Sequence, residues 1–79
     1  MTDAKDPGGR VRKRSVTVAG HATSVSLEQA FWRELGTLAA AEGISVNALI
    51  TRIDRERGGR GGNLSSAIRV HVLRHGGRD

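Results

Sequence analysis

The stretch AAAEGISVNALI, residues 39–50, contains the end of one helix and the beginning of the next. Gly43 follows a run of alanines, and glycine ends helices because it adopts the left-handed C′ conformation without steric cost. Ser45 follows two residues later, and serine starts helices because its hydroxyl accepts an otherwise unpartnered backbone N–H. The stretch therefore predicts two helices joined by about three residues.

Apolar residues at helical spacing extend this pattern in both directions. The first helix is expected to start at Ser26, since Gln29 stands three residues later, as in a capping box. Its apolar stripe is expected to be Phe31, Leu35, Leu38 and Ala39, with Trp32 at the margin. The second helix should start at Ser45, with Val46, Leu49, Ile50 and Ile53 on its apolar stripe. A third helix should start at Asn63, with Leu64, Ala67, Ile68 and Val72 facing the core.

Residues 14–28 alternate between apolar and polar side chains, as strands do. The phase of the alternation changes near Gly20-His21. A two-residue turn there would pair Val18 with Thr23 and Val16 with Val25. One face would then carry Val16, Val18, Thr23, Val25 and Leu27, and the other Ser15, Thr17, Ala22, Ser24 and Ser26. A short arm followed by a single strand, residues 22–27, is the alternative, and the sequence leaves both open.

Composition limits the kind of protein this is. The chain has 79 residues and no cysteine, which predicts a single domain without disulfides or thiolate metal sites. Its net charge of +5 favours a polyanionic partner, above all nucleic acid. We find no apolar run long enough for a membrane span and no signal-peptide core, so we expect a cytoplasmic protein. Residues 1–12 are expected to be a disordered basic tail, 13–75 the folded domain and 76–79 a disordered end.

An apolar strand face in so small a chain predicts a homodimer. Val25 and Leu27 need cover, and an open strand edge needs a partner. Two chains that pair their 22–27 strands would leave a two-stranded ribbon facing outward, with the width of the DNA major groove. The expected dimer core is Val25, Leu27, Phe31, Trp32, Leu35, Leu49, Ile50 and Ile53.

The segment TSVSLEQAFWRELGTLAAAEGISVNALITRI, residues 23–53, resembles ribbon-helix-helix DNA-binding domains of the Arc/MetJ type. With GNLSSAIRVHVL, residues 62–73, the pattern is similar to a short bacterial branch of that family. The resemblance implies a mainly α fold with a short β-ribbon, formed by intertwined protomers, plus a third C-terminal helix. It implies a transcriptional regulator whose ribbon enters the major groove.

Site residues follow from the resemblance by position. The base-reading residues would be Ala22, Ser24 and Ser26. The start of the second helix, Ser45, Val46 and Asn47, would hold a phosphate, and free N–H groups with the helix dipole favour an anion there. The basic run before the ribbon would add phosphate contacts from Arg10, Arg12, Lys13 and Arg14; a solvated tail is the alternative.

No catalytic constellation is present in the sequence, so we expect neither an enzyme nor a cofactor. His71 and His75 stand one helical turn apart, a spacing that metals use, but we interpret them as a packed pair and expect no metal. The alternative function is a protein-interaction module, such as an antitoxin-like or adaptor dimer, whose third helix binds another protein. Exposure of Val70 and Leu73 would favour that alternative.

Overall fold

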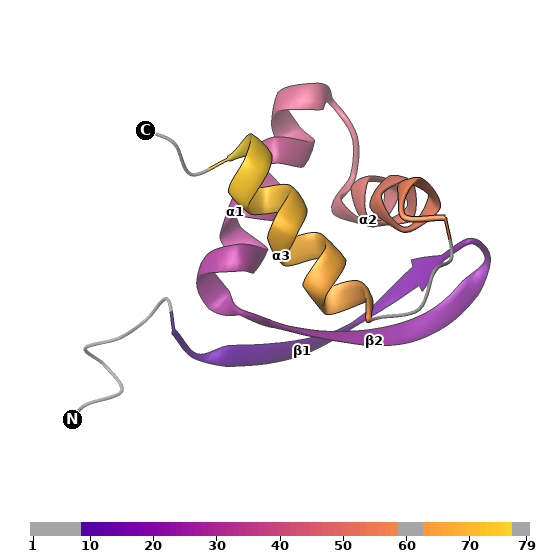
Figure 1. The fold of residues 1–79 in the computed structure, drawn as a ribbon, viewed down its shortest axis with the longest axis horizontal. Coiled ribbons are helices and arrows are strands. Elements are labelled where there is room, and N and C mark those ends of the chain that lie inside the picture. Colours follow the sequence, from indigo (N-terminus) through magenta and orange to yellow (C-terminus); the bar gives the residue numbers. More distant parts are fainter. Residues whose placement is uncertain (1–8, 59–62, 77–79) are drawn as a thin grey trace.

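The computed structural model describes residues 9–58 and 63–76. Of the predicted tails, 1–12 and 76–79, residues 1–8 and 77–79 lie outside the described residues. Strands β1 (Val11–Val18) and β2 (His21–Glu28) form an antiparallel ribbon, and helices α1 (Gln29–Glu42), α2 (Val46–Glu56) and α3 (Leu64–His75) follow. Figure 1 shows the three helices stacked on one side of the ribbon. The predicted mainly α fold with a ribbon and a third helix is confirmed.

The ribbon is a hairpin closed by Ala19 and Gly20. Both have positive φ, 52° and 84°, as a two-residue hairpin turn of type I′ requires. Val18 therefore pairs with His21, and Val16 pairs with Thr23. Our predicted register was wrong by two residues, because glycine takes the second turn position rather than the first. The predicted faces survive, since a shift of two leaves each side chain on its side of a strand.

The second strand replaces the arm that the sequence left open as an alternative. β1 begins at Val11, so Val11 and Arg12, which we assigned to the tail, belong to the ribbon. The indole N–H of Trp32 donates to the Arg12 carbonyl over 2.9 Å, and the Gln29 N–H donates to the Arg10 carbonyl over 2.7 Å. These two bonds hold the beginning of β1 against α1.

The helices of the same chain cover the apolar face of the ribbon. Val16 and Val18 are buried, and Leu27 is 0% exposed. The rest of the core is Val25, Trp32, Leu35, Ala39, Leu49, Ile50, Ile53, Ile68 and Val72. Our reason for a dimer, an uncovered strand face, is therefore wrong. Of the predicted dimer core, Phe31 is partly buried and the other residues lie buried within the single chain.

Helix α1 begins two residues later than predicted. Ser26 belongs to β2, and the N-cap is Glu28, whose side chain makes no capping bond to the described backbone. The strand continues through Glu28 because its pairing with β1 extends to Val11. The apolar stripe is also rotated, because Trp32 lies in the core with 4% of its surface exposed and Phe31 lies at the margin.

The joint between α1 and α2 and the start of α3 agree with the sequence-based prediction. Gly43 ends α1 in the left-handed conformation with φ 72°. The Ser45 hydroxyl accepts from the Ala48 N–H over 3.0 Å, and the Asn63 side-chain oxygen accepts from the Ser66 N–H over 2.8 Å. Both capping residues thus satisfy a helix N–H that has no partner inside the helix.

Candidate nucleic-acid interface

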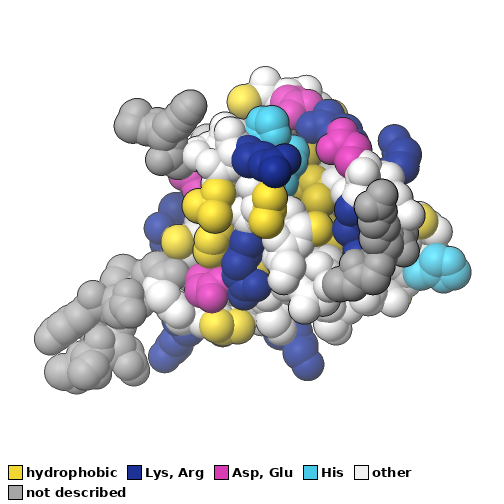
Figure 2. Space-filling model, in the orientation of Figure 1, with side chains coloured by type: hydrophobic (Ala, Val, Ile, Leu, Met, Phe, Trp, Pro, Cys, Tyr) yellow, Lys and Arg dark blue, Asp and Glu magenta, His cyan; other side chains and the backbone are white. Residues whose placement is uncertain are grey.

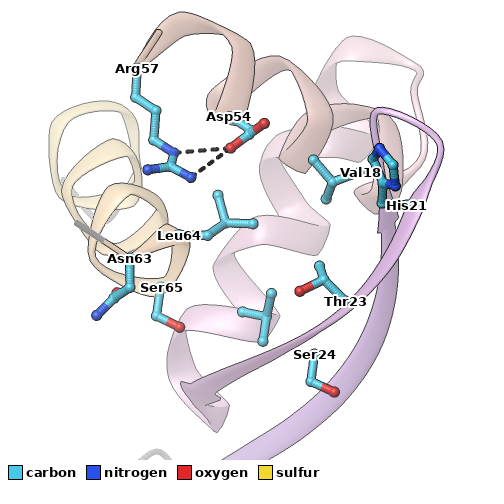
Figure 3. A pocket seen from close by; sticks show the side chains of 10 residues that line it. Val18, His21, Thr23, Ser24, Asp54, Arg57, Asn63, Leu64 and Ser65 are labelled. Atoms are coloured by element: carbon cyan, nitrogen blue, oxygen red, sulfur yellow. Dashed lines mark hydrogen bonds and ion pairs between the residues drawn. The ribbon is translucent and has the colours of Figure 1, made fainter. Parts of the chain in front are cut away.

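The face of the ribbon that points away from the helices carries small polar side chains. Across its centre Ser15 pairs with Ser24, Thr17 with Ala22, and Lys13 with Ser26. These six residues, which we call the outward face, are Lys13, Ser15, Thr17, Ala22, Ser24 and Ser26. All are exposed except Ser26, which is half-buried. In Figure 3, Thr23 and Ser24 lie on opposite sides of β2, as the alternation of a strand demands.

The predicted base-reading residues Ala22, Ser24 and Ser26 are thus brought together, but they form only half of the outward face. The other half comes from β1, which we had described as a possible arm. The hairpin alternative already placed Ser15 and Thr17 on this face, and continuing the alternation back through residues 11–14 would have added Lys13. The row of charges there concealed the strand pattern.

The basic run divides between the two faces of the ribbon. Lys13 lies on the outward face, whereas Arg12 and Arg14 have the opposite parity. The Arg14 guanidinium lies 4.8 Å from the centre of the Trp32 ring, a cation–π distance. Arg10 precedes β1, and its carbonyl oxygen accepts the hydrogen bond from the Gln29 N–H.

Three acidic side chains of the described residues, one at the end of β2 and two on the helices, are paired with arginines. Ion pairs join Arg69 to Glu28 at 2.9 Å, Arg52 to Glu42 at 2.7 Å, and Arg57 to Asp54 at 2.8 Å. Within the described residues, Arg12, Lys13 and Arg14 form no ion pair.

The start of α2 is bonded to the outer edge of β1 at Thr17. The Asn47 side-chain oxygen accepts from the Thr17 N–H over 3.4 Å, and the Thr51 hydroxyl donates to the Thr17 carbonyl over 3.4 Å. Because Ser45 caps Ala48, the N–H groups of Val46 and Asn47 are the ones that helix geometry leaves without an intrahelical partner. The predicted phosphate site thus adjoins the outward face and would act through backbone N–H groups.

Helix α3 covers the other edge of the ribbon near the end of β2. The Ser65 hydroxyl donates to the Ser26 carbonyl over 3.0 Å, and Arg69 holds Glu28. A partner strand that ran along residues 22–27 would meet α3 at this point. The Ser26 carbonyl is therefore already bonded within the chain, and the strand pairing that we expected in a dimer stays a prediction.

An open pocket of about 410 Å³ lies between β2 and the neighbouring ends of α2 and α3 (Figure 3). Leu64 extends into it, and Arg57 is held by Asp54 at its rim. Of the outward face, Ser24 alone lines this pocket. The other lining residues belong to the helix-facing side of the ribbon and to α2, α3 and their caps.

The histidine pair lies on α3, away from the outward face. The rings of His71 and His75 are 4.4 Å apart, with His71 half-buried and His75 exposed. Burial, and then the neighbouring His75, hold the pKa of His71 below its usual value. In the described part of the chain, no three histidine, cysteine or acidic side chains are placed to hold a metal ion. Nor is any helix there long and apolar enough to cross a membrane.

A search of curated proteins finds no match. The family model described as a ribbon-helix-helix domain matches residues 11–76, nearly the whole described chain. The chain belongs to the ribbon-helix-helix family. This family is a DNA-binding fold without enzymatic activity.

A solved structure supports the same fold. The chain is similar to an uncharacterized protein from Bordetella pertussis Tohama I, with 40% sequence identity and a TM-score of 0.79. The match covers 89% of this chain and 58% of the Bordetella protein. The ribbon-helix-helix domain described here therefore corresponds to little more than half of that longer protein.

Proposed function

We propose that this ribbon-helix-helix protein is a bacterial, cytoplasmic transcriptional regulator that binds double-stranded DNA as a homodimer. The observation that carries the proposal is the bond between the outward face and the start of α2 at Thr17. It places a groove-sized ribbon beside a helix N-terminus, so base contacts and a phosphate contact could form together.

The side chains of the outward face favour modest sequence discrimination. Lys13 can donate to guanine, whereas the hydroxyls of Ser15 and Ser24 donate or accept and distinguish bases poorly. Thr17 and Ala22 offer methyl groups that suit thymine. The remaining affinity would come from phosphates, through Arg10, Arg12 and Arg14 at the side of the ribbon and the N–H groups of Val46 and Asn47.

A hairpin within one chain also changes how the protein would dock. The hairpin of one chain already consists of two strands, and a two-stranded ribbon fits the width of the major groove. Each chain would therefore insert its own ribbon, and a homodimer would place two ribbons on two half-sites. The self-sufficient core of each chain supports assembly from folded chains rather than from intertwined ones.

Selection of bound duplexes from a random DNA pool tests this proposal. We expect enrichment of an inverted repeat, because a two-fold dimer reads two equivalent half-sites. On the selected duplex, Lys13→Gln should weaken binding and make the salt dependence shallower, because fewer counterions are released.

Arg55→Gln is the matched control, since Arg55 is an exposed cation on α2 away from the ribbon. It should leave both the affinity and the salt slope close to those of the unchanged protein. A pool that shows no enrichment, or equal effects of the two substitutions, would refute DNA recognition by the outward face.

A further inference from the structure

The exposed surface of α3 is apolar along its middle. Val70 and Leu73 are 46% and 72% exposed, and they stand three positions apart, so their side chains are neighbours on the helix. Leu73 lies on a different side of α3 from the buried residues Ile68 and Val72, and the core makes no use of it. Figure 2 shows hydrophobic side chains over α3, set between groups of Lys and Arg side chains. Two large apolar side chains on one helix are thus available to a partner.

An open groove lies between α2 and α3 beside these two residues, with a volume of about 650 Å³. Val70 lines it from α3, and Ile53 and Ala67, which are buried and partly buried, add apolar surface. Leu73 stands outside the groove, on the other side of Val70, as 3.6 residues per helical turn require. Apolar side chains of a partner could therefore cover Leu73 and enter the groove past Val70.

Arg74 is the cation best placed to bind an acidic partner. It lines the groove one turn after Val70, is exposed, and forms no ion pair within residues 9–58 and 63–76. Arg69, on the flank of Leu73 away from the groove, is already held by Glu28 at 2.9 Å. The helix itself contains no acidic residue. The positive charge that α3 can offer a partner therefore lies on the groove side.

Acidic groups lie near this surface at two places. Glu56, the last residue of α2, lines the groove, and Glu34 on α1 lies close to Gly76, just past the end of α3. A partner that is acidic only along the edge facing Arg74 fits this distribution better than one that is acidic on all sides.

We infer that the surface formed by Val70, Leu73 and Arg74, with the groove beside them, binds an amphipathic helix of a different protein. We call this surface the α3 ridge. Such a helix would place apolar side chains, spaced three and four positions apart, over Leu73 and into the groove. Its acidic side chains would lie along the edge that meets Arg74. The inference goes beyond the proposed function and does not depend on DNA binding.

Other occupants fit the α3 ridge less well. A DNA duplex presents phosphates to a protein surface and gives Leu73 no apolar cover. A second copy of α3 would set Arg74 against another helix without acidic residues. A small molecule in the groove would leave Leu73 exposed, because Leu73 is not among the described residues that line it.

Selection from a displayed library of random peptides, each about four helical turns long, tests the inference on the immobilised full chain. We expect the enriched peptides to share apolar residues at helical spacing with Asp or Glu along one edge. Fluorescence anisotropy of one selected peptide then measures its dissociation constant. Leu73→Ser and Arg74→Glu should each raise that constant at least about tenfold, with unchanged circular dichroism, because both side chains are exposed.

Arg55→Glu is the matched control, since it makes the same charge change at an exposed arginine of α2 outside the described lining of the groove. It should leave peptide binding unchanged. Replacing the acidic residues of the peptide with Gln or Asn should weaken binding to the unchanged protein and abolish the further effect of Arg74→Glu.

Three results would overturn the inference. One is a selection that enriches no acidic amphipathic sequence, and another is an equal loss of binding in Arg74→Glu and Arg55→Glu. The third is sedimentation of the unchanged protein, but not of Leu73→Ser, with vesicles of phosphatidylcholine and phosphatidylserine, which would make the α3 ridge a membrane contact. None of these experiments contains DNA, so their failure would leave the proposed function standing.

Discussion

At the scale of single residues, one of two neighbouring side chains in the ribbon packs in the core and the other lies on the outward face. Val25 is 2% exposed and packs in the core, whereas Ser24 is exposed and belongs to the outward face. Because side chains alternate along a strand, a substitution at Val25 should affect stability and one at the adjacent Ser24 should affect binding. Trp32 links the core to β1. Its indole N–H donates to the Arg12 carbonyl, while its ring packs in the core beneath Arg14.

Substitutions at Ser24 and Val25 should therefore act on different properties. Val25→Ser should lower the free energy of unfolding by roughly 1–3 kcal/mol, because an apolar side chain is replaced by a buried hydroxyl. Ser24→Ala should leave urea unfolding unchanged and weaken DNA binding. If Ser24→Ala melts the protein while Val25→Ser is silent, the outward face has been assigned to the wrong side.

His71 should make stability depend on pH in a narrow window. Burial lowers its pKa in the folded chain, so below about pH 6.5 the unfolded chain binds the proton more readily. Stability should thus be complete at pH 7, fall as the pH drops below about 6.5, and level off beneath the folded pKa. The groups around it are His75 on α3, Glu56 and Arg52 on α2, and Glu42 on α1.

Thermal melting between pH 7 and pH 5 measures this effect. His71→Gln should make the melting temperature less dependent on pH across that range, because the titrating group is gone. The lowered pKa of the Glu42 carboxyl, which Arg52 hydrogen-bonds, acts only in more acid solution and does not interfere. An identical pH dependence for the unchanged protein and His71→Gln would show that another group titrates.

At the scale of elements, the hairpin turn sets the register of the ribbon. Ala19 adopts φ 52°, a left-handed conformation that costs an L-residue other than glycine about 1–2 kcal/mol. Asparagine tolerates this conformation, so Ala19→Asn should raise the free energy of unfolding by about 0.5–1 kcal/mol in urea. Gly20→Ala should lower it, since nothing lies within 4 Å of the added carbon and backbone strain is its only effect. The opposite signs would show that the turn lies elsewhere.

The sequence predicted elements better than it predicted their ends. The Gly43–Ser45 joint was readable because each residue there has one strong local preference. The start of α1 was not, because Ser26 resembles an N-cap while the long-range pairing of Glu28 with Val11 keeps it in a strand. The central place of Trp32 was also hidden, since it depends on where β1 lies and not on spacing within α1.

The candidate site was only half readable for the same reason. Ala22, Ser24 and Ser26 followed from strand parity and resemblance, and Ser15 and Thr17 followed from the hairpin alternative. Which of these residues pair across the strands required the hairpin register. The bond from Thr17 to Asn47 joins residues thirty positions apart, and no local pattern predicts it. Contacts of this kind appear only once the whole chain is folded.

At the scale of the whole molecule, the residues that stabilise the fold and those proposed to bind DNA lie in different places. The core lies between the ribbon and the helices, and the outward face lies on the far side of the ribbon (Figure 1). Exposed hydrophobic side chains lie over α3 (Figure 2). This separation means that substitutions in one surface should leave the others intact.

The most direct test of the central claim is an NMR titration of the isotope-labelled full chain with the selected duplex. We predict that the amide signals that shift most belong to Lys13, Ser15, Thr17, Ala22 and Ser24, together with Val46 and Asn47. Signals from the outer side of α2, such as Arg55, should stay in place. Shifts confined to the helices, with the outward face unchanged at saturating DNA, would contradict the account.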